Sequence, residues 1–188
     1  VYKARIPERS IQTNFVRGKI CEDENWNIWY SNEAGIFYYD RLEDKLIAAC
    51  FFRKNEFKGF LFEGIAIEKG QFWMINYHFG IFSFNTSTRT FRKYDFPYSV
   101  TRSDPGLFRS TYDHKGNIWF NCFQNDGQNR FNIFSKRFSR HFEGREVMYI
   151  YFGKKKYFLL NTSSEVTQYD PVSKVYSPLI MGDKGGTF

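Results

Sequence analysis

The chain has 188 residues, enough for one ordinary domain, and its 27 lysines and arginines outnumber its 20 aspartates and glutamates, giving a formal charge of +7. No apolar run is long enough to cross a membrane, and no signal peptide is visible. The sequence also has no nucleic-acid motif, phosphate-binding loop, nucleophile elbow or CxxC pair. These features argue against nucleic-acid partners and against enzymes that carry one of these motifs. They predict no catalytic residues, no cofactor and no metal site.

In chain order, a short unit of a tight turn and an aromatic strand occurs four times. The copies are EDENWNIWY, IEKGQFWMI, DHKGNIWF and GKKKYFLLN, which place Trp29, Trp73, Trp119 and Phe158 at one equivalent position. The turn is preceded by Asp23 in the first copy and Asp113 in the third, and its glycine position holds Trp26, Gly70 and Gly116 in the first three copies. An aspartate at a turn start can accept backbone N–H groups of that turn.

A second block follows each of these units. GIFYYD, GIFSFN, GQNRFN and EVTQYD end at Asp40, Asn85, Asn132 and Asp170. Six residues later stands a bulky apolar residue: Leu46, Phe91, Phe138 and Tyr176. Three of the intervals carry a basic residue at one offset: Arg89, Lys136 and Lys174. The copies are about 38 to 47 residues apart, which fits a four-stranded propeller blade.

Each copy therefore predicts four short strands. Aromatic residues make up 21% of the chain, which suits sheets that bury their faces against one another. The second strand is NIWY or NIWF, and the third begins near Gly35, Gly80 or Gly127, where a side chain is expected to hinder the backbone. No stretch of ten residues has helical periodicity, so the fold class is all-β, a β-propeller of about four blades of four-stranded antiparallel sheet.

The combined pattern, an Asp, a turn, Asn-Ile-Trp, a loop and then Gly-Ile-Phe-x-Tyr-Asp, resembles the two-component regulator propeller repeat. That repeat occurs in the extracytoplasmic sensor regions of bacterial hybrid two-component systems, especially in Bacteroidetes. The resemblance covers almost the whole chain and is closest in the first and third copies. It implies a periplasmic location, a homodimer in the full-length sensor, and a membrane segment and a kinase outside this chain.

The expected blades cover residues 16–53, 62–96, 107–143 and 146–181, within one propeller region spanning residues 1–188. Residues 1–15 are expected to end a preceding blade, because VYKARIP has the character of an outer strand. Since four blades of this type rarely close a ring, the sequence favours part of a larger propeller. A four-bladed ring with ragged ends is the alternative.

Most singled-out residues are expected to serve the scaffold. The structural repeat positions are Asp23, Trp29, Gly35, Trp73, Gly80, Asp113, Gly116 and Trp119. The three cysteines, Cys21, Cys50 and Cys122, are interpreted as buried free thiols, with a bond from Cys21 to Cys122 as an alternative. His114 is expected at a turn tip and His141 on an outer strand, neither with metal-ligand spacing.

Binding is expected in the loops that differ between copies, because a propeller presents its loops on a rigid scaffold. The loops between second and third strands, and those between blades, are expected to open on one face. The candidate residues are Asn32, Glu33, Asn76, Tyr77, His78, Arg102, Asp104, Arg109 and Gln124. Amides, cations and an aromatic ring suit an oligosaccharide, whose hydroxyls need hydrogen bonds and whose apolar face stacks on rings.

The sequence thus favours a ligand-sensing propeller that is not itself an enzyme. Two other classes remain open. A propeller enzyme such as a lyase would need a histidine or carboxylate cluster at the centre of the ring, and a purely structural interaction propeller would need no small-molecule site.

Overall fold

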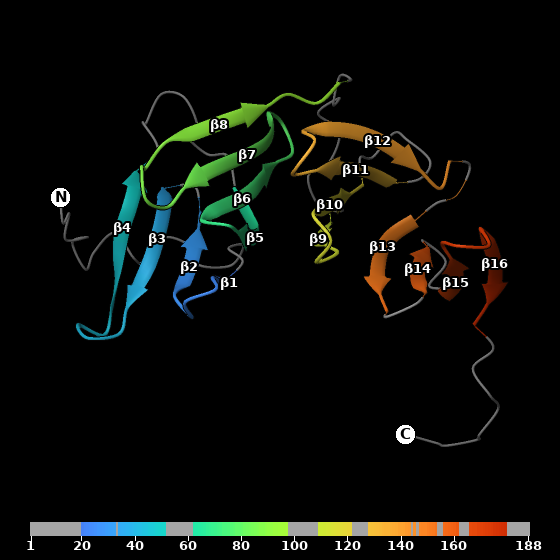
Figure 1. Cartoon of the computed structure of the whole chain (residues 1–188), viewed down its shortest axis with the longest axis horizontal. Helices are drawn as coiled ribbons and strands as arrows, with labels where there is room; N and C mark the ends of the chain where they lie inside the picture. The colour runs from blue at the N-terminus through green and yellow to red at the C-terminus, as the bar shows by residue number, and fades with distance from the viewer. Residues whose placement is uncertain are drawn as a thin grey trace, which may run out of the picture. The chain divides into compact units, whose positions relative to one another are not determined.

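The computed structural model of the chain describes residues 20–32, 34–51, 62–97, 109–121, 128–143, 145, 147–153, 156–161 and 166–179 (Figure 1). The chain divides into two compact units, residues 1–102 and 103–188. Each unit contains two four-stranded sheets.

The first unit holds two antiparallel meanders with strands in sequence order. The first sheet consists of β1 (Ile20–Glu22), β2 (Ile28–Ser31), β3 (Gly35–Asp40) and β4 (Lys45–Phe51). The second consists of β5 (Glu63–Glu68), β6 (Gln71–Asn76), β7 (Gly80–Asn85) and β8 (Phe91–Tyr94). These two sheets are the first and second blades.

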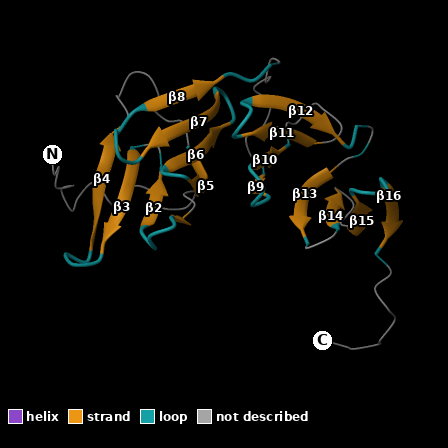
Figure 2. Ribbon diagram, in the orientation of Figure 1, coloured by secondary structure: helices purple, strands orange, loops and turns teal. Residues whose placement is uncertain are grey.

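The second unit repeats this arrangement. The third blade consists of β9 (Ser110–Tyr112), β10 (Asn117–Phe120), β11 (Gln128–Asn132) and β12 (Arg137–His141). The fourth consists of β13 (Val147–Phe152), β14 (Tyr157–Asn161), β15 (Val166–Asp170) and β16 (Val175–Pro178). Every regular element of the described residues is a strand (Figure 2), which confirms the predicted all-β propeller with four four-stranded blades. The expected preceding strand, residues 1–15, lies outside the described part of the chain.

Each blade has two distinct ends. The turn end carries the turns between strands one and two and between strands three and four. The loop end carries the loop between strands two and three and the links to neighbouring blades. This division follows directly from the meander order of each sheet.

At the turn ends, the predicted aspartates hold the first turn as expected. In the third blade, Oδ1 of Asp113 accepts the backbone N–H groups of Lys115 at 2.8 Å and Asn117 at 2.9 Å. Oδ2 accepts the Asn117 side-chain amide at 2.7 Å and the indole N–H of Trp119 at 3.2 Å. The repeated Asp, Asn and Trp therefore form one hydrogen-bonded group that fixes the turn and gives the indole nitrogen a partner.

The first blade contains the same group. Asp23 accepts the amides of Asn25 and Asn27 and the side chain of Asn27, and Trp29 donates to its Oδ2 at 2.9 Å. Burial by itself raises the pKa of Asp23, but the hydrogen bonds from Trp29, Asn27 and Asn25 outweigh burial and lower that pKa below its usual value. This carboxylate is therefore a fixed part of the turn.

The second turn of each blade also repeats. Oδ1 of Asp40, Asn85, Asn132 and Asp170 each accepts two backbone N–H groups, those two and three residues further on. The fourth residue after it is left-handed in every blade: Asp44, Arg89, Lys136 and Lys174. The repeated offset of six residues also has a structural meaning, because Leu46, Phe91, Phe138 and Tyr176 lie directly opposite the residue before the Asp or Asn. The turn geometry thus fixes the register of strands three and four.

The tryptophans occupy equivalent positions, as the repeat predicts. Each lies opposite the residue two before the closing Asp or Asn: Trp29 opposite Tyr38, Trp73 opposite Ser83, and Trp119 opposite Arg130. In the fourth blade Phe158 lies opposite Gln168, which is the same position. The substitution of Phe for Trp therefore leaves the register unchanged.

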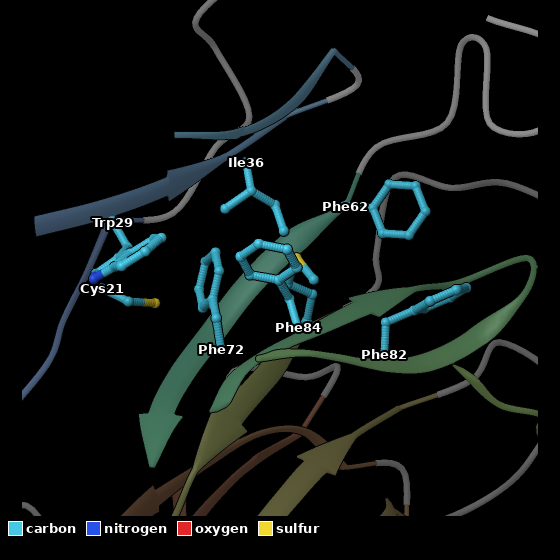
Figure 3. Packing of buried hydrophobic residues seen from close by; sticks show 8 residues of the cluster. Cys21, Trp29, Ile36, Phe62, Phe72, Phe82 and Phe84 are labelled. Carbon is cyan, nitrogen blue, oxygen red and sulfur yellow. The ribbon is translucent and has the colours of Figure 1, made fainter. Parts of the chain in front are cut away.

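Face-to-face packing of the first two blades forms the core of the first unit. Trp29 of the first blade and Phe72 of the second have ring centroids 6.3 Å apart, and Phe72 directly precedes Trp73 (Figure 3). The surrounding cluster also contains Ile36, Phe82 and other buried side chains of both sheets. The tryptophan of one blade is thus covered by the residue before the tryptophan of the next.

The second unit follows the same rule. Trp119 lies 6.2 Å from the ring of Tyr157, which directly precedes Phe158, and 5.7 Å from that of Phe152. Val147, Ile150 and Leu159 of the fourth blade belong to the same buried cluster. Two pairs of neighbouring blades therefore pack by one residue pattern.

Glycines at the start of the third strands are required for different reasons. A Cβ atom at Gly35 would lie 2.1 Å from the carbonyl oxygen of Cys50, so the neighbouring strand leaves no room for a side chain. At Gly80 a Cβ would lie 2.3 Å from the carbonyl oxygen of Tyr94, and φ is also left-handed at +128°. Close approach of the fourth strand is therefore the shared cause, and only Gly80 adds a conformational one. Gly127 lies outside the described residues.

Candidate functional site

The loop ends carry the residues for which binding is predicted. Asn32, Asn76, Tyr77, His78 and Arg109 are described, and all five lie at loop ends of the first three blades. Glu33, Arg102, Asp104 and Gln124 lie outside the described residues, so their predicted role remains a prediction.

Asn32 and Asn76 hold the loops between second and third strands. Oδ1 of Asn32 accepts the backbone N–H groups of Ala34 at 2.8 Å and Gly35 at 3.2 Å. Oδ1 of Asn76 accepts that of His78 at 3.0 Å, and the Asn76 side chain is buried. Both amides therefore shape the loops, and Asn76 is positioned to act on a ligand only through the turn that it fixes.

The second blade presents a phenol and a carboxylate joined at its loop end. The hydroxyl of Tyr77 donates to Oε2 of Glu63 at 2.9 Å, across the sheet between the turn after β6 and the start of β5. Both side chains are half-buried, and the neighbouring His78 is exposed. The bond restricts the tyrosine ring while leaving part of it accessible. Sequence reasoning named Tyr77 but missed Glu63, because their contact joins the turn after β6 to the start of β5.

Arg109 lies at the entry to the third blade. Its backbone N–H donates to Oδ1 of Asn121 at 2.7 Å, and the Asn121 N–H donates to the Arg109 carbonyl at 3.3 Å. This pair of bonds extends the β9 and β10 ladder by one residue. The Arg109 residue is exposed, so the bonds fix its backbone and leave its cationic side chain toward solvent.

Two buried polar side chains tie neighbouring blades together at the loop ends. Ser31 Oγ donates to the Phe62 carbonyl at 2.9 Å, joining the first blade to the second. The Gln128 side-chain amide donates to the Val147 carbonyl, joining the third blade to the fourth. Sequence reasoning missed both residues. The only signal for Ser31 was a small polar residue that ends the otherwise apolar strand IWYS.

A titratable cluster lies on the third blade, beside Trp119. The His141 ring packs 5.0 Å from that of Trp119, and its Nε2 lies 3.0 Å from Ser139 Oγ. The Arg130 Nε donates to the same hydroxyl at 3.0 Å. Burial, and then the charge of Arg130, lower the pKa of His141 to about 4, so the imidazole is neutral at pH 7. His141 does lie on the outer strand, as predicted, and its neighbours give it a packing role.

Two features of the described residues bear on metal binding and membrane insertion. No group of three or more His, Cys, Asp or Glu side chains among them is placed to hold a metal ion. None of their elements is a helix long and apolar enough to span a bilayer. Cys21 is buried in the first core, as predicted, whereas Cys50 is only half-buried, and burial raises the pKa of its thiol. Cys122 lies outside the described residues.

Comparison with known proteins identifies solved structures of similar fold. No protein-family model matches the chain, and no curated protein matches it. The extracellular domain of the putative one component system BT4673 from B. thetaiotaomicron has a TM-score of 0.59 at 17% identity, over 90% of this chain and 24% of that one. The extracellular domain of the putative hybrid two component system BT3049 from the same organism has a TM-score of 0.56 at 13% identity, over 86% and 24%.

An enzyme also shares the fold. Virginiamycin B lyase from Staphylococcus aureus has a TM-score of 0.54 at 15% identity, over 82% of this chain and 56% of that one. At these identities the likeness establishes the propeller fold alone. The chain spans about a quarter of the length of the two extracellular domains. The BT3049 domain belongs to a hybrid two component system, the class of protein in which the resembled repeat occurs.

Proposed function

We propose that this chain is part of the periplasmic sensor propeller of a hybrid two-component regulator, and that its loop ends bind an oligosaccharide. The signal would pass to a kinase outside this chain, and the chain itself would catalyse no reaction. Two independent lines support the sensor class. The sequence repeat resembles that of such regulators, and solved extracellular domains of hybrid two component systems share the fold.

The observation that carries the ligand class is the Tyr77 and Glu63 pair. A partly accessible aromatic ring offers a flat apolar surface for the face of a pyranose. The adjacent Glu63 carboxylate is an acceptor, and sugar hydroxyls are donors that suit it. The exposed His78 lies next to this pair. Since the ring is already restricted by the Glu63 bond, less conformational entropy is lost when a sugar stacks on it.

Calorimetric titration with neutral and acidic oligosaccharides tests the proposal. Tyr77→Ala should weaken binding by about tenfold or more. Stacking of one ligand ring on an aromatic side chain contributes roughly 1 to 3 kcal/mol to the binding free energy, and the variant would lose that contribution. Tyr77→Phe keeps the ring and should retain most of the affinity. His114→Ala, at the turn end of the third blade, is the matched control and should bind like wild type. Equal affinity in wild type and Tyr77→Ala would reject this site.

The other two classes give different results in the same experiment. A lyase would consume the oligosaccharide and release unsaturated products, whereas a sensor returns it unchanged. An interaction propeller would bind none of the sugars. The shared fold with a lyase adds no support for that alternative, because the likeness carries no site residue.

A further inference from the structure

Two arginines lie on one face of the third blade, on its two outer strands. Trp119 of β10 lies opposite Arg130 of β11, and Arg130 lies opposite Ser139 of β12 (Figure 1). Arg137 begins β12 two residues before Ser139, so its side chain lies on the same face. Diagonal neighbours on adjacent strands are about 7 to 8 Å apart, within reach of two long side chains. We name Arg130, Arg137, Ser139 and His141 the third-blade rim.

The Arg130 side chain is held in place by its neighbours. Its Nε donates to Ser139 Oγ at 3.0 Å, and its guanidinium carbon lies 5.7 Å from the centre of the Trp119 ring. Ser139 Oγ also lies 3.0 Å from Nε2 of His141, so the hydroxyl can donate to the neutral imidazole while it accepts from Arg130. Within the described part of the chain, these hydrogen bonds use only the Nε–H of Arg130. Its terminal N–H groups can therefore donate to a ligand.

The positive charge of the third-blade rim is not paired with a carboxylate in the described part of the chain. No salt bridge there includes Arg130 or Arg137. The carboxylate beside Trp119 is that of Asp113, which is buried and used within the first turn. Burial, and then the charge of Arg130, lower the pKa of His141 to about 4. Because the imidazole is neutral at pH 7, the two guanidiniums supply the charge of the rim.

The other blades show that the fold does not require an arginine at this position. The residue two before the closing Asp or Asn is Arg130 in the third blade, and it is Tyr38, Ser83 and Gln168 in the others. The fourth blade pairs Gln168 with Ser177, so it keeps a serine opposite this position without any charge. Two arginines on one face repel each other, and an anion bound between them would offset that repulsion.

We propose that the third-blade rim binds an oxyanion with two negative charges, such as sulfate or a phosphate group. The terminal N–H groups of Arg130 and Arg137 would donate to its oxygens, because the guanidinium fork matches the geometry of such oxygens. Two guanidiniums match the charge of a dianion better than that of a carboxylate. The rim shares no residue with the proposed oligosaccharide site, so either proposal can fail alone.

Nuclear magnetic resonance titration of the 188-residue chain tests the proposal through the tryptophan indole N–H signals. Sodium sulfate or sodium phosphate is added at neutral pH and constant ionic strength, with sodium chloride as the balancing salt. The Trp119 signal should shift and saturate at millimolar concentration, because the Arg130 guanidinium lies against this ring. Trp29 is the internal control, since its indole also donates to an aspartate but the residue opposite it is Tyr38.

Arginine-to-glutamine variants separate the rim from general charge. Arg130→Gln copies the fourth blade, and Arg137→Gln removes the second guanidinium. Each should raise the dissociation constant for sulfate by about tenfold, since charge-assisted hydrogen bonds are lost. Arg137 is exposed, so its variant tests the site even if Arg130→Gln alters the packing against Trp119. Arg140→Gln removes an equal charge from the other face of β12 and should bind like wild type.

Different anions identify the group that is recognised. Acetate, which has one charge, should bind at least about tenfold more weakly than sulfate. A sugar phosphate that binds like inorganic phosphate would show that the phosphate group alone is recognised, and tighter binding would show that the sugar also makes contact.

Three results would overturn the proposal. The first is a Trp119 signal that neither sulfate nor phosphate shifts. The second is equal affinity for sulfate in wild type and Arg137→Gln, because the rim would then not be the site. The third is equal binding of acetate and sulfate, because the rim would then have no preference for a dianion.

Discussion

The turn ends of the four blades resemble one another, whereas the loop ends differ. At the turn ends, every blade has an Asx residue that accepts two amides and a left-handed residue four positions later. At the loop ends, the described contacts change from blade to blade: an asparagine turn, a tyrosine and carboxylate pair, and an arginine and asparagine pair. The repeated hydrogen bonds specify the blade, so the loop ends are free to vary and to acquire binding residues.

A second difference lies within the turn ends. The first and third blades use the Asp, Asn and Trp group, whereas the second blade makes its first turn with Lys69 and Gly70 alone, both left-handed. Its turn is shorter by one residue, yet Trp73 reaches the same register. The aspartate is therefore one of two solutions to the same geometry, and it is used where the turn is longer.

The largest expected effect comes from removing a repeat tryptophan. Trp119 is 3% exposed and contacts rings of both the third and fourth blades. Trp119→Ala should lower the free energy of unfolding by about 3 to 5 kcal/mol, as for a large aromatic residue removed from a core. Chemical denaturation measures the loss. A loss below about 1 kcal/mol would place the ring outside the core and would break the equivalence of the blades.

Glycine substitutions test whether the loop ends share one structural requirement, the close approach of the fourth strand to the start of the third. Gly80→Ala combines a left-handed φ with a backbone contact of 2.3 Å and should cost about 2 to 3 kcal/mol in chemical denaturation. Gly64 is a useful comparison, because its φ is not left-handed and its Cβ would meet the side chains of Phe72 and Ser31 instead of backbone atoms. Gly64→Ala should therefore cost less than Gly80→Ala. A larger stability loss in Gly64→Ala than in Gly80→Ala would show that side-chain packing, and not the approach of the fourth strand, is the stronger requirement for glycine.

The fold was predictable from the sequence because the repeated residues act locally. Asp23 and Asp113 hold turns within six residues, and the offset from Asp40 to Leu46 sets one strand pairing. Contacts between blades were not predictable in detail. Ser31 reaches the Phe62 carbonyl across 31 positions, and Glu63 reaches Tyr77 from another strand, so no local pattern marks them.

Acid sensitivity should separate the second unit from the first. Because the pKa of His141 is lowered to about 4 in the folded chain and is about 6.5 when unfolded, the unfolded state binds more protons between these values. The contribution of neutral His141 to the free energy of unfolding is therefore fully present above about pH 6.5, and it is lost as the pH falls toward 4. The loss should be about 1 to 2 kcal/mol after allowance for the half-exposed ring.

Chemical denaturation at about pH 7.5 and about pH 5 measures this dependence, since carboxylates with ordinary pKa values stay largely ionised over that range. His141→Gln removes the titrating ring and should reduce the difference between the two pH values. His78→Gln is the matched control at an exposed position of the first unit and should keep the wild-type difference. An unchanged pH dependence in His141→Gln would mean that other groups cause the acid loss.

The central claim is that the turn ends hold the scaffold while the loop ends are free to bind. The most direct measurement compares the free energy of unfolding of Asp113→Ala with that of His78→Ala. Asp113→Ala leaves two amides, an asparagine and an indole without their acceptor, so it should lose about 2 to 3 kcal/mol. His78→Ala alters an exposed loop residue and should change stability by less than about 0.5 kcal/mol. Equal losses in the two variants, or a larger loss in His78→Ala, would contradict the claim.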